Sequence, residues 1–177
     1  GCLNTACGNH ALGANTTATY NTALGARALK SNKTGAHNTG VSYNALQATT
    51  TGACNTAIGN YALGTNTTGH SNTAVGYTAL YLNTTGTYNT ATGKCALGKN
   101  TTASYNVAVG NCALKSNTTA EFNTAVGTST LYSNLTGACN TGVGFNALYS
   151  SACAHRNTAV GYKAAKATTS GYDGTSW

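Results

Sequence analysis

The chain has 177 residues, the size of one domain, and only 6% of them are charged, whereas a typical globular domain carries about 25%. Asn, Thr, Ala and Gly dominate, and the net charge is +7 because Glu121 and Asp173 are the only acidic residues. This composition excludes a solvated helical domain, and it excludes chemistry that needs paired carboxylates. The positive charge favours contact with anionic surfaces such as acidic polysaccharide or lipopolysaccharide.

A tandem repeat of 17 residues organises the chain from residue 4 to residue 173, without insertion or deletion. Its consensus is N-T-A-V-G-x-x-A-L-x-x-N-x-T-G-x-x, and the residues that share a position in successive coils are called a column here. Column 1 is Asn in all ten coils: Asn4, Asn21, Asn38, Asn55, Asn72, Asn89, Asn106, Asn123, Asn140 and Asn157. Residues 1–3 and 174–177 are interpreted as continuing chain, 1–3 forming an incomplete cap.

Within each coil, columns 1–5 predict a short strand, as in residues 55–59. Side chains alternate along a strand, so columns 2 and 4 share one face and columns 3 and 5 share the other. Column 4 is Val, Ile or Leu in eight coils, and this residue is expected to enter the core. A second strand is expected near the Ala and Leu of columns 8 and 9, as in residues 62–63, and a turn at columns 12–15.

The repeat predicts an all-β fold, a parallel β-solenoid of ten coils. A coil of 17 residues is too short for two packed helices, which need about 33 residues in known arrays. Stacked at about 4.8 Å, ten coils make a rod roughly 48 Å long, with the column 1 amides in a hydrogen-bonded ladder.

The expected core is thin, and this predicts a homo-oligomer. Each coil offers one Val-type residue and one Leu, and fully burying such a side chain contributes about 1.5–3 kcal/mol. Ordering each residue costs on the order of 1–2 kcal/mol. Ladder hydrogen bonds and a second face buried against other chains are expected to close the gap.

Two segments carry a resemblance to known fibres. Residues 106–110, N-V-A-V-G, resemble the S-V-A-I-G core of YadA-type trimeric autotransporter heads. Residues 72–86, N-T-A-V-G-Y-T-A-L-Y-L-N-T-T-G, resemble repeats of phage and algal-virus tail-fibre proteins. The resemblance implies a left-handed β-roll in a homotrimeric fibre that is extracellular, at a cell surface or on a virion. The chain departs from the YadA pattern because its coils are longer than about 14 residues.

Tyrosines at the coil corners are the candidates for contact with a host glycan or lipopolysaccharide, and the alternative is packing at corners or between chains. The tyrosines are Tyr77, Tyr81, Tyr88, Tyr105, Tyr132, Tyr149 and Tyr162. We predict no enzyme, cofactor or metal site, because no triad, phosphate loop or ligand cluster is recognisable. The Lys residues are too dispersed for a nucleic-acid groove, and no apolar run predicts membrane insertion.

Two further patterns leave alternatives open. Seven Asn of column 12 begin N-x-T sequons, which indicate either N-glycosylation or turn geometry, with the turn favoured. Cys95 and Cys112 share column 7 of adjacent coils, within disulfide distance, although free thiols are favoured by the dihedral requirement.

The function predicted from these patterns is a structural and adhesive fibre. Alternatives are an ice-binding solenoid that uses the Thr of columns 13 and 14, and a filament that assembles end to end.

Overall fold

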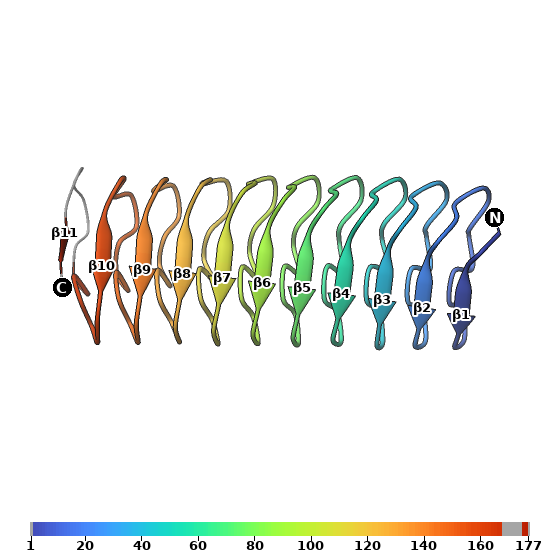
Figure 1. Ribbon diagram of the computed structural model, residues 1–177, viewed down its shortest axis with the longest axis horizontal. Coiled ribbons are helices and arrows are strands. Elements are labelled where there is room, and N and C mark those ends of the chain that lie inside the picture. Colours follow the sequence, from blue (N-terminus) through green and yellow to red (C-terminus); the bar gives the residue numbers. More distant parts are fainter. Residues whose placement is uncertain (1, 168–174, 177) are drawn as a thin grey trace.

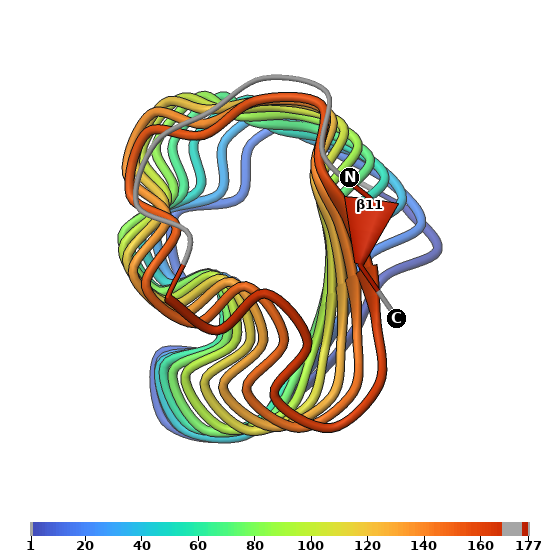
Figure 2. The same cartoon turned by 90° about the vertical axis from the view of Figure 1, so that its left-hand side faces the viewer.

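A computed structural model of the protein describes residues 2–167 and 175–176, and its eleven strands form one parallel sheet. The chain winds into a rod in which each coil contributes one strand (Figure 1). Seen end on, the strands stack along one side of a closed loop (Figure 2). The strands are β1 Thr5–Cys7, β2 Thr22–Leu24, β3 Thr39–Val41, β4 Thr56–Ile58, β5 Thr73–Val75, β6 Thr90–Thr92, β7 Val107–Val109, β8 Thr124–Val126, β9 Thr141–Val143, β10 Thr158–Val160 and β11 Thr175–Ser176.

Each strand pairs in parallel with its neighbours in the sequence, in the register of the repeat. Thr90 of β6 lies beside Val107 of β7, and Thr158 of β10 lies beside Thr175 of β11. The predicted all-β parallel solenoid is thereby confirmed, and the described residues form no helix. Thr175 and Ser176, which were expected only to continue the chain, add one more rung to the sheet.

The prediction of a second strand at columns 8 and 9 is wrong, because this segment is a turn. Leu97 has φ 50° and Cys95 has φ 57°, both in the left-handed region, which no strand residue adopts. Neighbouring coils are nevertheless hydrogen-bonded here: the Leu97 N–H donates to the Ala113 carbonyl of the next coil at 3.0 Å. Ladder hydrogen bonding therefore continues around the coil beyond the strand.

The apolar half of the interior is built from columns 3, 8 and 9, and the prediction that column 4 enters the core is wrong. Leu97 of column 9 is fully buried, whereas Ile58 and Val109 of column 4 are 42% and 37% exposed. The space beside the buried Leu decides which face of the strand points into the interior. A Cβ at Gly40 of column 3 would already lie 3.4 Å from the Leu29 side chain, so only Ala or Gly fits opposite the Leu column. The larger Val-type residues face outward.

The polar half of the interior is a set of buried amides that close each coil. Asn72 of column 1 and Asn83 of column 12 both donate from Nδ2 to the carbonyl of Gly86 in column 15, at 2.8 and 3.0 Å. A Cβ at Gly69 of the same column would lie 2.5 Å from the Gly86 carbonyl oxygen, so the backbone of Gly69 lies very close to the next coil. The two Asn side chains thus clip the turn to the strand.

Column 1 also links successive coils. The Asn89 N–H donates to Oδ1 of Asn72 at 2.9 Å, and the Asn89 Nδ2 reaches the same oxygen at 3.1 Å. The backbone contact recurs at every step from Asn4 to Asn157. The ten Asn lie in single file along the rod.

Column 12 forms a second amide ladder, which the sequence did not reveal. Asn83 donates to Asn66 at 2.9 Å and Asn100 donates to Asn83 at 2.8 Å. The ladder stops where Thr49 and Ser151 replace Asn. Six of the sequon Asn are fully buried, and their Nδ2 atoms, where a glycan would attach, donate to carbonyls of column 15. The folded rod therefore favours the turn interpretation of these sequons.

Candidate functional site

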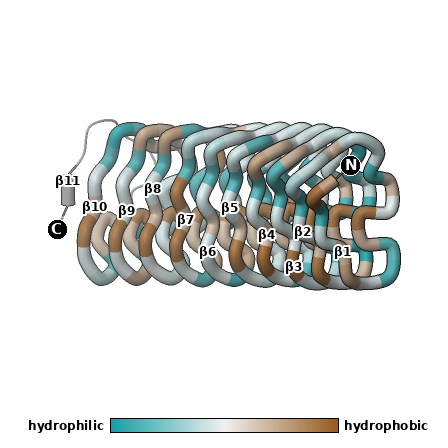
Figure 3. Tube along the Cα trace, turned by 45° about the vertical axis from the view of Figure 1, so that its right-hand side comes forward, coloured by the Kyte–Doolittle hydropathy of each residue, from teal (hydrophilic) through white to brown (hydrophobic). Residues whose placement is uncertain are grey.

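The outward face of the sheet is uncharged along the rod. All nine basic and both acidic residues lie outside columns 1–5 in every coil. The outward rows are the Thr of column 2, which is half-buried, and the Val-type residues of column 4, which are half-buried to exposed over most of the rod. Figure 3 shows apolar segments that recur at the same place in successive coils. This surface, columns 2 and 4 of β1–β10, is called the sheet face below.

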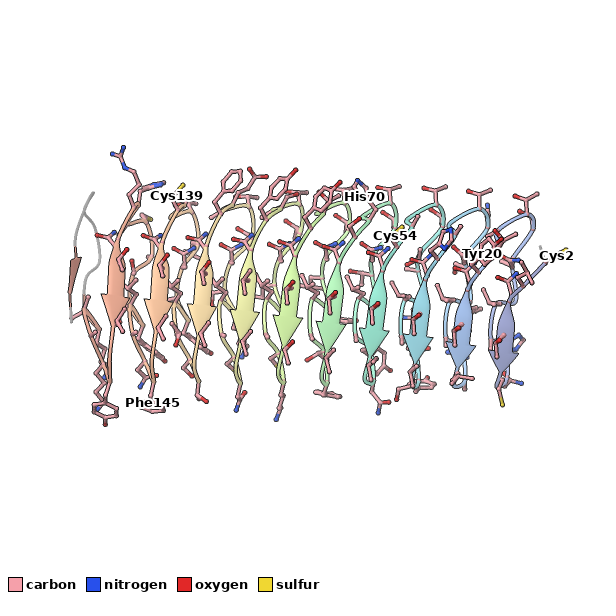
Figure 4. The ribbon with its side chains drawn as sticks, viewed as in Figure 1. Cys2, Tyr20, Cys54, His70, Cys139 and Phe145 are labelled. Carbon is pink, nitrogen blue, oxygen red and sulfur yellow. The ribbon has the colours of Figure 1, made fainter. Side chains whose placement is uncertain are left out.

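Aromatic side chains line both edges of the sheet face. Figure 4 places His70 of column 16 and Cys139 of column 17 at one edge and Phe145 of column 6 at the opposite edge. Because columns 17 and 6 flank the strand in every coil, aromatic residues in neighbouring coils fall into files that run parallel to the rod. The predicted contact tyrosines belong to these files and to a third file in column 10.

Tyr88 and Tyr105 stand in a closed stack. Their ring centroids are 5.1 Å apart with an interplanar angle of 8°, and Tyr105 stacks on Phe122 at 5.2 Å and 5°. His70 meets Tyr88 edge to face at 5.1 Å. Since a sugar packs its C–H groups against a ring face, these two predicted residues offer mainly ring edges and hydroxyl groups.

Tyr132 and Tyr149 are also covered. Their rings stack at 5.1 Å, Lys115 lies 5.5 Å from the Tyr132 centroid, and Lys166 lies 5.9 Å from the Tyr149 centroid. Lys115 also donates to the Tyr132 hydroxyl at 3.4 Å, and this hydrogen bond raises the pKa of the Lys115 ammonium. The order of the residues in column 10 places a cation on each outer face of the pair.

Tyr162 is the most exposed of the predicted tyrosines. Its ring stacks on Phe145 at 5.6 Å, and the Lys163 ammonium lies 4.8 Å from its centroid. Both ring partners come from the same end of the rod, so Tyr162 likewise enters an aromatic and cationic cluster.

Tyr77 and Tyr81 lie elsewhere, in a hollow of about 350 Å³ that Tyr61 and Thr78 complete. The Tyr61 and Tyr81 rings meet edge to face, 5.9 Å apart at 87°. A Cβ at Gly64 would lie 3.0 Å from the Tyr81 ring, so the bare backbone of Gly64 lets that ring lie across the preceding coil. Columns 6, 7 and 10 of two successive coils therefore meet in a tyrosine-lined depression, called the tyrosine hollow below.

Sequence reasoning missed Tyr61, Thr78 and Gly64. Column 7 holds a different kind of residue in almost every coil, so Tyr61 shares no column with Tyr77 or Tyr81. The sequence does show three tyrosines within residues 61–81. The left-handed turn geometry is what brings these three side chains together around a hollow.

The cysteines are free thiols in the described residues. The Thr78 Oγ1 lies 3.2 Å from the Cys95 Sγ. Burial, followed by the neighbouring Cys95, raises the pKa of the Cys112 thiol. No three His, Cys, Asp or Glu side chains in the described part of the chain gather closely enough to hold a metal ion. In the same residues there is no helix of the length and hydropathy that a membrane span requires.

Comparison with known proteins found no family model, no curated protein and no solved structure that matches the chain at a significant level.

Proposed function

We propose that the chain is a segment of a rigid extracellular fibre, on a virion or a cell surface, that assembles as a homotrimer of left-handed β-rolls and adheres to surface glycans. Its mechanism is display: the ladders stiffen the rod, and residues at the coil corners contact the host surface. The basic side chains, all outside columns 1–5, favour an anionic partner.

The sheet face is the observation that carries the proposal. A row of Val-type side chains, interrupted by Thr92 and with Ile58 42% and Val109 37% exposed, runs beside a row of Thr and has no charge in its columns. Extended exposed apolar patches of this kind mark interaction surfaces. A second copy of the chain is the natural partner, because both faces then repeat with the same rung spacing.

The composition of the interior supports the same assembly. Each coil from the second to the ninth buries one Leu and a few Ala, together with amides whose hydrogen bonds contribute about 0.5–1.5 kcal/mol each. Burying the remaining exposed area of column 4 against neighbouring chains adds apolar area at about 25 cal/mol per Å². Association thereby supplies burial that the single rod lacks.

Sedimentation equilibrium of the purified chain tests the assembly. The wild-type chain is expected to sediment as a trimer, and the double variant Val109→Lys/Val126→Lys as a monomer, because it places two charges on the sheet face. The matched control Thr102→Lys/Thr119→Lys changes exposed column 14 side chains and is expected to stay trimeric. A wild-type monomer at micromolar concentration would contradict the proposal, and open-ended growth would favour the self-assembling filament.

Ice binding is the weaker candidate. The hydroxyls of column 13 donate to the backbone of the next coil, as Thr67 does to the Thr84 carbonyl at 3.0 Å, and Thr84 to the Thr101 carbonyl at 3.1 Å. Half of the Thr array expected to order water is therefore engaged internally. The exposed Thr of column 14 keep this candidate testable, and measurable thermal hysteresis would favour it.

A further inference from the structure

The tyrosine hollow has the properties of a small-ligand site. Its volume of about 350 Å³ lies at the lower end of the range of about 300–1,000 Å³ for such sites, which suits one sugar ring with its substituents. Tyr61, Tyr77 and Tyr81 each present an apolar ring and a hydroxyl. A pyranose has the same division between an apolar C–H face and a polar rim of hydroxyls.

Tyr77 is available for stacking in a way that the other predicted tyrosines are not. Its side chain is 52% exposed, and among the described residues no ring or cation packs against its ring. Tyr81 leans across Gly64 and meets Tyr61 edge to face, which makes a wall next to Tyr77. The hollow thus combines a free ring face with a fixed aromatic wall.

Charge around the hollow selects the ligand. Lys94 occupies column 6 in the coil after Tyr77, and its side chain is exposed. The N–H of the next residue, Cys95, donates to the Tyr77 carbonyl at 2.9 Å, so Lys94 and Tyr77 lie on adjacent rungs. The one acidic side chain among the described residues, Glu121, lies in column 16, next to the opposite edge of the sheet face. A carboxylate on the ligand therefore meets a cation and no competing carboxylate.

We propose that the tyrosine hollow binds one pyranose unit of an anionic polysaccharide, with Tyr77 stacked on the sugar ring and Lys94 paired with its carboxylate. This inference rests on the adhesive role proposed above and names the substrate class and the residues that would serve it.

Calorimetric titration of the intact chain with hexagalacturonate, and in parallel with neutral maltohexaose, tests the site. Hexagalacturonate is expected to bind and maltohexaose to bind at least tenfold more weakly. Tyr77→Ala is expected to weaken hexagalacturonate binding about tenfold, the size of one good aromatic contact. Lys94→Gln is expected to weaken hexagalacturonate binding and to reduce its salt dependence, because one exposed charge pair is lost.

Tyr105→Ala is the matched control, since it removes a tyrosine of comparable exposure from the closed stack and is expected to leave the affinity unchanged. Equal affinity of the Tyr77→Ala variant, equal loss in the Tyr105→Ala variant, or equal binding of maltohexaose would each overturn the inference. Sedimentation of the same samples separates the two proposals. If the chain is trimeric but binds neither oligosaccharide, the proposed site is wrong and the proposed fibre stands. If the chain is monomeric but binds hexagalacturonate through Tyr77, the proposed trimer is wrong and the proposed site stands.

Discussion

Columns 9 and 4 are the two columns of the repeat that hold large aliphatic side chains in most coils, yet they lie on opposite sides of the coil wall. Leu97 and its equivalents in the second to ninth coils are fully buried, whereas Val109 and its equivalents face outward and are half-buried to exposed. Repetition within a sequence therefore reports a recurring environment, which is not always an interior. In column 9 the environment is the core of one chain, and in column 4 it is the sheet face that the proposed trimer covers.

The difference between columns 9 and 4 is tested most directly by replacing one side chain in each column with Ala. Leu97→Ala is expected to lower the free energy of unfolding by about 2–5 kcal/mol, because it leaves a cavity in a thin core. Val109→Ala is expected to cost less than about 1 kcal/mol in the isolated rod. Urea unfolding at low protein concentration measures both. Equal losses would mean that the sheet face is already buried under those conditions.

The Asn of column 1 extend the comparison, because column 1 is at least as constant as column 9 although its buried side chains are polar. Asn89→Ala removes the bonds of its Nδ2 to Asn72 and to the Ala103 carbonyl, and leaves the Asn106 N–H without its acceptor. The expected loss in the free energy of unfolding is about 1–3 kcal/mol, the cost of buried polar groups left unpaired.

Asn111→Ala is the control, because Asn111 of column 6 is exposed. Its effect is expected to stay within about 0.5 kcal/mol in the same urea titration. A similar small effect of Asn89→Ala would show that the column 1 ladder contributes little to stability.

A smaller effect of opposite sign is expected where the column 12 ladder is interrupted. Asn32 Oδ1 is buried and has no hydrogen-bond partner among the described residues, because Thr49 stands where the next Asn would donate. Thr49→Asn is expected to raise the free energy of unfolding by about 1 kcal/mol, one net hydrogen bond. Thr51→Asn, at an exposed position of the same coil, controls for composition. Equal unfolding midpoints for the two variants would argue against the ladder.

The smallest effect concerns thiol chemistry on the turn side of the coil. Burial and the neighbouring Cys95 raise the pKa of Cys112, so a smaller fraction of its thiol is ionised near pH 8. We expect iodoacetamide to alkylate Cys112 more slowly than the exposed Cys139, as followed by peptide mass spectrometry. Cys95→Ser is expected to speed the alkylation of Cys112. An unchanged rate in that variant would leave burial as the sole cause.

The fold was readable from the sequence because the interval of the column 1 Asn sets the register of the sheet directly. The strand period also placed columns 2 and 4 on one face, as the structure has them. The strand period could not say which face of the strand points into the interior. Apolarity favoured the face with the Val of column 4, whereas the space beside Leu29 admits only Ala or Gly at position 40 of column 3. The tyrosine hollow was unreadable because it depends on left-handed turn residues such as Tyr61, whose φ is 61°.

The amide ladders have a consequence for the conditions under which the rod persists. The buried polar side chains among the described residues are Asn, Thr and Ser, none of which gains or loses a proton between strongly acidic and strongly basic solution. Acid unfolding usually works by protonating paired carboxylates or by charging buried histidines. Because the interior consists of neutral groups, acid has no buried titratable group to protonate. We therefore expect the rod to stay folded in acidic solution and in saline solution alike.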